Sequence, residues 1–271
     1  MRVLITNSTL AARAGTELYV RDLATALLER GHTPIAYSTW LGDVAAELRA
    51  ATVPVIDDLS VLTEPPDIIH GQHHPEAMTA LLSFPGVPAV FMCHGWMPWE
   101  ELPPLFPRIL RYIAVDHTCR DRLVLEAGIP EERTRVLLNF VDLDRFAPRD
   151  PLPEAPRRAL LFSNQAREGN FVDAVRDACG KSGLSLDVVG LGAGNPTSRP
   201  EELLREYDIV FAKARAALEA MAVGAAVILC DEAGSGPMVT TQELDRLRAF
   251  NFGLRTLRRP LEAGVLGDVV T

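Results

Sequence analysis

The sequence predicts an α/β protein with two doubly wound parallel-sheet domains. Short apolar segments, typical of buried parallel strands, alternate with helical segments along all 271 residues. The segment 147–156 contains four prolines in ten residues, which is typical of a stiff and exposed linker. We therefore predict a first domain over residues 1–148, a linker over 149–157 and a second domain over 158–271.

Composition limits the classes of partner. A formal net charge of −9 argues against a nucleic-acid binder, which needs a basic face. No apolar stretch is long enough to span a bilayer, and the N-terminus begins as a strand without the features of a signal peptide. The four cysteines lack metal-ligand spacing and are interpreted as buried free thiols. We expect a cytoplasmic protein with no nucleic-acid partner and no integral membrane segment, and the sequence leaves its oligomeric state open.

The first predicted domain begins with a strand over 2–7 and a helix over 16–30, whose apolar residues recur on one face. Gly15 stands at the start of that helix, where unpaired N–H groups suit a phosphate or a reacting hydroxyl. A turn that merely needs a small residue is the alternative. Further strands are predicted at 34–38, 53–56, 67–70, 87–94, 109–115 and 135–138, and helices at 41–51, 77–82 and 119–127.

The second predicted domain repeats this alternation. The glycine-rich loop 190–194 is interpreted as a tight turn rather than a dinucleotide site, because prolines and no clear helix follow it. A loop is expected over 231–240. The strands are predicted at 159–163, 184–189, 208–212 and 225–230, and the helices at 170–179, 214–223 and 241–250.

One carboxylate is out of keeping with its surroundings in the strand–helix–strand unit 208–231. Glu219 lies in the middle of an otherwise apolar helix. A solvent-facing glutamate is the ordinary explanation, since glutamate is rarely buried. Its apolar neighbours leave little polar face for it, and a carboxylate near the carboxyl end of a parallel sheet is suited to accept hydrogen bonds from two ribose hydroxyls.

Histidines follow two of the predicted strands of the first domain. His70, His73 and His74 lie in one short segment, but with only Glu76 beside them the ligand set is thin, and we predict no metal. His94 ends the apolar run 87–94, where it is either a core histidine bonded to a carbonyl or a group that opens onto the crevice where α/β sheets bind ligands. We favour the second interpretation.

Four segments together resemble the retaining glycosyltransferases of family 4. They are LEAMAVGAAV at 218–227, AGTELYVRDLATALLERGH at 14–32, DIIHGQHHPEA at 67–77 and NFVDLDRF at 139–146. The resemblance covers nearly the whole chain, which it identifies as a short or C-terminally truncated member. It implies the GT-B fold, in which two Rossmann-like domains face each other across a cleft. It also implies transfer from a nucleotide sugar to an acceptor small molecule, lipid or glycan, with no cofactor besides the donor.

The resemblance also implies roles for residues of this chain. Glu219 matches the glutamate that holds the nucleotide ribose, and His94 matches the histidine that contacts the transferred sugar. Gly15 matches the second of two usual glycines, the first being replaced by Ala14. On the acceptor side His70 and Asn139 match family positions, Gln72 stands in the usual place of a second histidine, and His73 is a further candidate.

Two departures from the family pattern concern the donor. Phe211 stands in the place of a first glutamate that usually contacts the donor sugar. The usual cations for the diphosphate are also missing, because Ser163-Asn164 and Glu168-Gly169 fall in their places. We therefore expect replacement contacts from the side chains of Arg167, Lys213 and Arg215 and from the backbone around Gly234, Ser235 and Gly236.

The predicted function is a metal-independent, retaining transfer of a hexosyl or related group. The competing hypothesis is a non-catalytic nucleotide-sugar-binding protein on the same scaffold, which the missing glutamate and missing cations favour. A dinucleotide-dependent oxidoreductase fails for want of a full Gly-x-Gly-x-x-Gly after the first strand.

Overall fold

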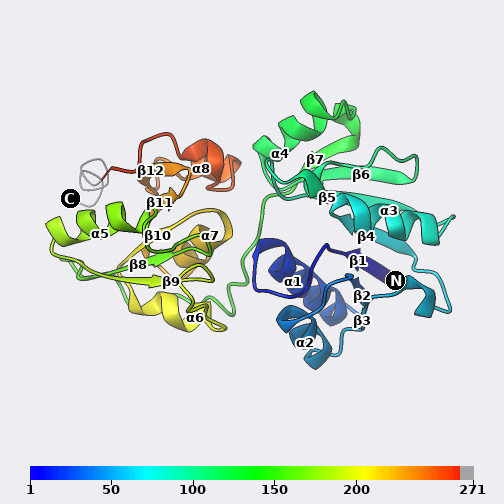
Figure 1. Cartoon of the computed structure of the whole chain (residues 1–271), viewed down its shortest axis with the longest axis horizontal. Coiled ribbons are helices and arrows are strands. Elements are labelled where there is room, and N and C mark those ends of the chain that lie inside the picture. Colours follow the sequence, from blue (N-terminus) through cyan, green and yellow to red (C-terminus); the bar gives the residue numbers. More distant parts are fainter. Residues whose placement is uncertain (263–271) are drawn as a thin grey trace. The chain divides into compact units, whose positions relative to one another are not determined.

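The computed structural model describes residues 1–262 and divides into two compact units (Figure 1). The first unit is Met1–Leu137 and the second begins at Leu138. Each unit has its own sheet and its own apolar cores on the two faces of that sheet. Two α/β units with separate sheets agree with the predicted fold class.

The first unit contains a seven-stranded sheet in the order β3-β2-β1-β4-β5-β6-β7. Every neighbouring pair is parallel. The chain winds outward from β1 in one direction and from β4 in the other, so the order reverses between these two strands. The strands are β1 Arg2–Thr6, β2 Thr33–Tyr37, β3 Val55–Ile56, β4 Ile68–Gln72, β5 Ala89–Cys93, β6 Ile109–Ala114 and β7 Thr134–Val136.

Helices cover both faces of this sheet (Figure 1). The helices α1 Gly15–Glu29 and α2 Asp43–Ala50 pack on one face through residues such as Val20, Ala24 and Val44. The helices α3 His74–Ser83 and α4 His117–Asp121 pack on the other through Ala77, Leu81 and Cys119. α4 continues as a π-helical turn, Arg122–Glu126. This is the doubly wound arrangement that the alternation of strands and helices predicted.

The second unit contains a five-stranded sheet in the order β12-β11-β10-β8-β9. Its helices α7 and α8 pack on one face and α5 on the other. The strands are β8 Arg158–Phe162, β9 Ser185–Val189, β10 Ile209–Ala212, β11 Ala226–Asp231 and β12 Gly234–Met238, and the helices are α5 Val172–Lys181, α6 Pro200–Leu203, α7 Ala214–Ala222 and α8 Leu244–Ala249.

Strand β12 was not predicted, and it corrects two expectations. The sequence placed a loop over 231–240, and it predicted a wholly parallel sheet. β12 instead pairs antiparallel with β11, with Ser235 opposite Cys230. Its glycines are explained by close backbone approach: a Cβ added at Gly236 would lie 2.7 Å from the Thr256 carbonyl oxygen. Glycines that suggested a loop therefore belong to an edge strand.

The boundary between the units also differs from the prediction. The sequence placed it at the proline-rich segment, whereas the structure places it at 137/138. Phe146 is 1% exposed and belongs to the core of the second unit. Arg149 donates through its guanidinium to the Tyr207 carbonyl and pairs with Asp208 at 3.3 Å. The segment that resembled a free linker is therefore anchored to the second unit.

Two aspartates anchor corresponding strands in the two units. Asp67, just before β4, accepts the backbone N–H of Arg2 at 2.7 Å at the start of β1. Asp208, just before β10, accepts the backbone N–H groups of Arg157 and Arg158 at 2.8 and 3.1 Å at the start of β8. Each carboxylate satisfies amides at the amino-terminal edge of its sheet, which would otherwise lack partners.

We predict that Phe146→Ala lowers the free energy of unfolding of the second unit by about 3–5 kcal/mol, the usual cost of emptying a buried phenylalanine site. All three tryptophans, Trp40, Trp96 and Trp99, lie in the first unit. Urea unfolding followed by circular dichroism should therefore show an earlier transition that tryptophan fluorescence does not report. Leu143→Ala, in the same segment but 66% exposed, is the control and should leave both transitions in place.

Candidate functional site

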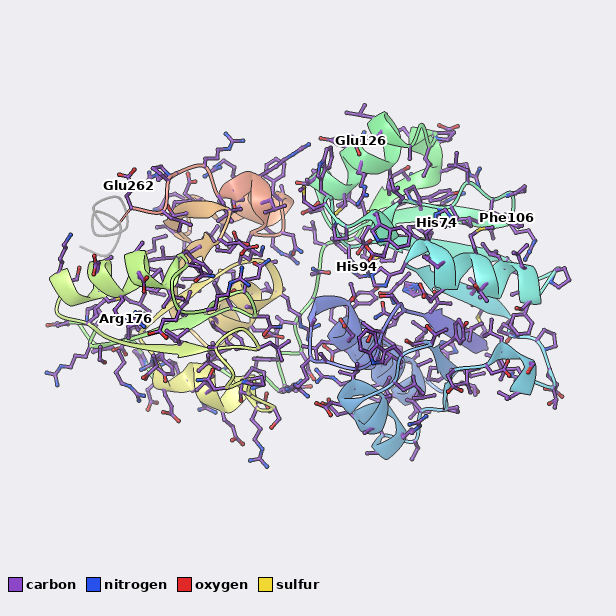
Figure 2. All side chains as sticks on the ribbon, in the orientation of Figure 1. His74, His94, Phe106, Glu126, Arg176 and Glu262 are labelled. Carbon is purple, nitrogen blue, oxygen red and sulfur yellow. The ribbon has the colours of Figure 1, made fainter. Side chains whose placement is uncertain are left out.

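Polar side chains gather at the carboxyl ends of β1, β4 and β5. His94, labelled in Figure 2, directly follows β5. β1 and β4 pair in register, with Ile5 opposite His70, and this pair of strands is where the order of the sheet reverses. Ligands of open α/β sheets bind at such a reversal, outside the carboxyl ends of the strands. The first candidate site is therefore built on this edge.

Tyr19 of α1 lies against both histidines of this edge. Its hydroxyl is 3.5 Å from Nε2 of His70, and its ring packs edge-on to the ring of His94, with the centroids 4.6 Å apart. Burial lowers the pKa of each histidine to about 4 and raises the pKa of Tyr19 to about 12. At neutral pH the surface that these three side chains form carries no charge of its own.

Several buried polar atoms at this edge have no hydrogen-bond partner among the described residues. Both side-chain polar atoms of Gln72, Nδ1 of His70, Nε2 of His94 and Oδ1 of Asn7 are in this state. Buried polar atoms are ordinarily paired, and an unpaired one costs free energy. The set contains amide and imidazole groups that can donate or accept, so it suits a ligand with several hydroxyls.

His73 takes part in a second contact network of the same edge. Its Nδ1 accepts the backbone N–H of Ser8 at 2.9 Å, and its Nε2 lies 3.6 Å from Oε1 of Glu101. The other oxygen of Glu101 accepts the backbone N–H of His94 at 2.7 Å.

The predicted strand ended at His70, but β4 runs on to Gln72. Thr6 Oγ1 donates to the C=O of Gln72 and accepts from its N–H, both at 2.9 Å.

The helix α1 begins at Gly15, as predicted. A Cβ added at this glycine would meet no atom within 4 Å, so the space beside the helix start is open. Glu17 in the first turn is 4% exposed, and burial raises its pKa. The N-terminal amides and a buried carboxylate therefore lie on the same turn of the helix.

The second unit brings together three predicted donor residues around the start of α7. Glu219 is 4% exposed, and its Oε1 accepts from Nε of Arg215 at 2.7 Å. Lys213, between β10 and α7, forms an ion pair with Asp231 at the end of β11. Burial lowers the pKa of Lys213. Glu219 is thus a buried carboxylate, as the sequence suggested, and both predicted cations are already paired with acids.

The remaining predicted donor residues belong to two other segments of the second unit, and Gly234 lies opposite Asp231, the partner of Lys213. Arg167 is exposed in the loop between β8 and α5. Gly234, Ser235 and Gly236 belong to β12, and the N–H of Ser235 donates to the Arg259 carbonyl, so this amide is taken within the protein. Phe211, which replaces the usual first glutamate, is fully buried against α5.

Asn139 is corrected from the first domain to the second unit. It lies two residues beyond the boundary, and its carbonyl accepts from the guanidinium of Arg248. No three histidine, cysteine, aspartate or glutamate side chains within residues 1–262 are arranged to hold a metal ion.

Sequence reasoning missed Tyr19, Ser8 and Glu101. Tyr19 occupies an ordinary position in an amphipathic helix, so the sequence pattern does not indicate that it also contacts His70 and His94. Glu101 follows strand β5 by eight residues, in a segment whose course no periodicity predicts. Their roles depend on which loops meet in space, and only the register of β1, β4 and β5 fixes that.

The comparisons agree with this architecture. Residues 13–145 match the model of Glycosyltransferase Family 4. No curated protein matches the sequence. Among solved structures, Anabaena HepE in complex with UDP and glucose is similar with a TM-score of 0.67 and 15% identity, over 100% of this chain and 89% of that one. A glycosyltransferase from Rickettsia africae has a TM-score of 0.62 and 17% identity, over 83% of this chain and 78% of that one.

A third similar structure is the apo form of the lipopolysaccharide outer core galactosyltransferase WaaB. Its TM-score is 0.58 at 11% identity, with 100% of this chain and 94% of that chain covered. These likenesses show that the two units form the GT-B fold. Among residues 1–262 no helix has the length and apolar character that a membrane crossing requires.

We predict that His70 makes the first unit sensitive to acid. The unfolded chain binds a proton at this imidazole below a pH of about 6.5, whereas the folded chain does so only near a pKa of about 4. The stability of the first unit therefore falls as the pH drops from about 6.5 to about 4, by up to about 3 kcal/mol from this group. Above pH 6.5 this contribution is constant.

The measurement is urea unfolding followed by tryptophan fluorescence at a series of pH values. His70→Gln should reduce the dependence on pH between 4 and 6.5 without abolishing it, because His94, whose pKa is also about 4, still titrates over this range. His32→Gln removes a histidine outside this edge and is the control. Equal slopes for the parent and His70→Gln would contradict the prediction.

Proposed function

We propose that this chain is a retaining glycosyltransferase that uses a nucleotide sugar, because residues 13–145 match the model of Glycosyltransferase Family 4 and the chain has the GT-B fold. The observation that carries the proposal is the neutral, half-buried His94 at the end of a central strand, beside several polar atoms that lack partners among the described residues. A neutral imidazole can donate to or accept from a sugar hydroxyl without charge, so it orients the sugar.

In this proposal the second unit binds the nucleoside diphosphate. Glu219 supports it, because it is a buried carboxylate on α7, and a carboxylate is a group that accepts hydrogen bonds from ribose hydroxyls. UDP is the first ligand to test, because the similar Anabaena HepE structure is a complex with UDP and glucose. The similar WaaB structure is a galactosyltransferase. The donor is expected to carry a hexosyl or related group.

Lys213 and Arg215 are the proposed partners of the diphosphate. Each is held by a carboxylate, Lys213 by Asp231 and Arg215 by Glu219. A diphosphate would add negative charge to two cations that are already placed and partly desolvated, which strengthens the attraction over that of two mobile surface cations. Arg167 and the backbone of Gly234 and Gly236 remain proposed secondary contacts.

The proposed reaction forms a bond between the acceptor hydroxyl oxygen and the anomeric carbon while the bond to the diphosphate breaks. The acceptor attacks from the face that the diphosphate leaves, so the anomeric configuration is kept. The protein contributes positioning and cations for the leaving charge. A metal-independent reaction in the cytoplasm is part of the proposal, and four buried free cysteines are in keeping with a reducing compartment.

A non-catalytic nucleotide-sugar-binding protein is the second candidate. Burial of Phe211 favours it, because the side chain in the place of the usual sugar-binding glutamate lies in the core and offers no polar atom. The two candidates differ in one measurable property. A transferase releases UDP from UDP-glucose, whereas a binding protein leaves the donor intact.

We predict that Glu219 is responsible for recognition of the ribose. The parent protein should bind UDP more tightly than an analogue that lacks the 2′ and 3′ hydroxyls, by about 1.5–3 kcal/mol for charge-assisted hydrogen bonds. Glu219→Ala should bind both ligands with similar, weaker affinity in isothermal titration calorimetry. Glu206→Ala removes a solvent-exposed ion-pair partner of Arg158 in the same unit and should keep the preference. Unchanged discrimination in Glu219→Ala would refute the assignment.

We also predict that His94→Ala lowers turnover by on the order of 100-fold while UDP affinity and fold are retained, because misorientation of the sugar alone has such an effect. The assay is UDP release from UDP-glucose with methanol as acceptor, which requires no knowledge of the natural acceptor. NMR of the methyl glycoside should show the anomeric configuration of the donor, and EDTA should not abolish the reaction. His32→Ala is the control; an inverted product would exclude the proposed mechanism.

A further inference from the structure

We infer that Glu101 is a positioning residue that holds the predicted sugar-orienting His94 in place through its backbone, together with His73. The inference rests on the proposed function for what His94 does, and on the contacts of Glu101 for how His94 is held. Glu101 is 2% exposed and lies in the short helical turn Trp99–Glu101 that follows β5. It does not act on the substrate itself.

Glu101 joins the ends of three neighbouring strands. Ser8, beyond β1, donates its N–H to Nδ1 of His73, beyond β4, at 2.9 Å. Nε2 of His73 faces one carboxylate oxygen of Glu101 at 3.6 Å, and the other oxygen accepts the N–H of His94, beyond β5, at 2.7 Å. The contacts therefore run in the order of the strands in the sheet, from β1 through β4 to β5.

The direction of these contacts fixes the hydrogens. Nδ1 of His73 accepts from an amide, so it must keep its lone pair, and the hydrogen of the neutral ring is then on Nε2. That hydrogen points toward Glu101. The carboxylate consequently has two donors and no acceptor facing it, which is the arrangement that suits its ionised form.

The backbone of His73 is evidence that this arrangement is built in. Its φ of 58° and ψ of 132° lie in a region that L residues rarely adopt. This conformation directs the ring between Ser8 and Glu101, and residues with such strain cluster at functional sites. A histidine with no task at this position would be replaced at no loss by glycine, which adopts positive φ without strain.

The loop that carries Glu101 is itself held firmly. The guanidinium of Arg122, 4% exposed, donates to the carbonyls of Gly95 and Pro98 at 2.7 and 2.8 Å. A Cβ added at Gly95 would lie 3.2 Å from Pro98, so the chain folds back tightly just after His94. With both the loop and the carboxylate fixed, Glu101 can set the position of the His94 backbone to a fraction of an ångström.

The charges around His73 set the pH range over which the network persists. Burial raises the pKa of Glu101. The hydrogen bond from His73 and the electrostatic effects of His94 and His73 lower it by more, so the pKa of Glu101 is lowered overall. Burial lowers the pKa of His73, but the hydrogen bond and charge of Glu101 and the charges of Glu76 and Glu17 outweigh it, so the pKa of His73 is raised overall. Protonation of Glu101 would place its new hydrogen against either the His94 N–H or the His73 Nε2–H. The positioning of His94 is therefore lost only when the pH falls low enough to protonate Glu101.

Glu101→Gln tests the inference with almost no change of shape. A carboxamide has one acceptor oxygen and one NH₂ group, so in either orientation its NH₂ faces a donor, the His94 N–H or the His73 Nε2–H. We expect turnover with UDP-glucose and methanol to fall by on the order of 10- to 100-fold, with KM for the donor and affinity for UDP unchanged. Glu100→Gln makes the same chemical change one residue away and should keep parent turnover.

A double-variant comparison separates positioning from a general structural effect. If Glu101 acts through His94, Glu101→Gln should lower turnover in the parent but not further in His94→Ala. Additive losses would overturn the inference. Glu101→Asp retains two acceptor oxygens on a shorter side chain and should recover part of the lost turnover; if it is no better than the glutamine variant, the inference fails as well.

NMR gives a readout that does not need activity. In protein labelled with ¹⁵N-histidine, the parent should show His73 with its hydrogen on Nε2, and Glu101→Gln should shift both the amide and the ring signals of His94. Unchanged signals would overturn the inference. A parent protein that releases no UDP but shows these shifts would refute the proposed function and leave the positioning role of Glu101 supported.

Discussion

Parallel pairing of β1, β4 and β5 is the constraint on which the candidate site depends. It brings three loops that are far apart in sequence to one edge, so that Ser8, His73 and His94 follow neighbouring strands. A shift of register by one residue would turn His70 and Gln72 to the opposite face of the sheet. The contacts from Ser8 through His73 and Glu101 to His94 then have no common edge on which to form. The apolar cores that fix the register therefore also fix the site.

The two edges of each sheet have different tasks. At the amino-terminal edge, Asp67 and Asp208 accept amides from the strand beside them, and each has its hydrogen bonds satisfied by the protein. At the carboxyl-terminal edge of the first unit, polar atoms of His70, Gln72 and His94 lack partners within residues 1–262. Stability is thus concentrated at one edge, and unsatisfied hydrogen-bonding capacity at the other, where a ligand can supply it.

The sequence was sufficient for what depends on local periodicity and insufficient for what depends on loops. The strand and helix order, the helix start at Gly15 and the buried carboxylate of Glu219 follow from local patterns and were predicted. Strand β12 and the anchoring of Phe146 were not, because glycines and prolines imply loops whether or not a strand or a core receives them. The contacts of Glu101 could not be predicted, because they depend on where the loops after β1, β4 and β5 lie in space.

The two units handle charge differently, and this bears on which part of a nucleotide sugar each suits. The imidazoles of His70 and His94 are neutral at pH 7, and the buried carboxylate of Glu101 is occupied by internal donors. A surface of this kind favours hydroxyls and offers nothing to a diphosphate, because a second anion near Glu101 would be repelled in a medium of low dielectric. In the second unit Lys213 and Arg215 supply positive charge near α7. The first unit offers hydrogen-bonding groups without positive charge, and the second unit offers cations. The division that we propose therefore has sugar hydroxyls on the first unit and the diphosphate on the second.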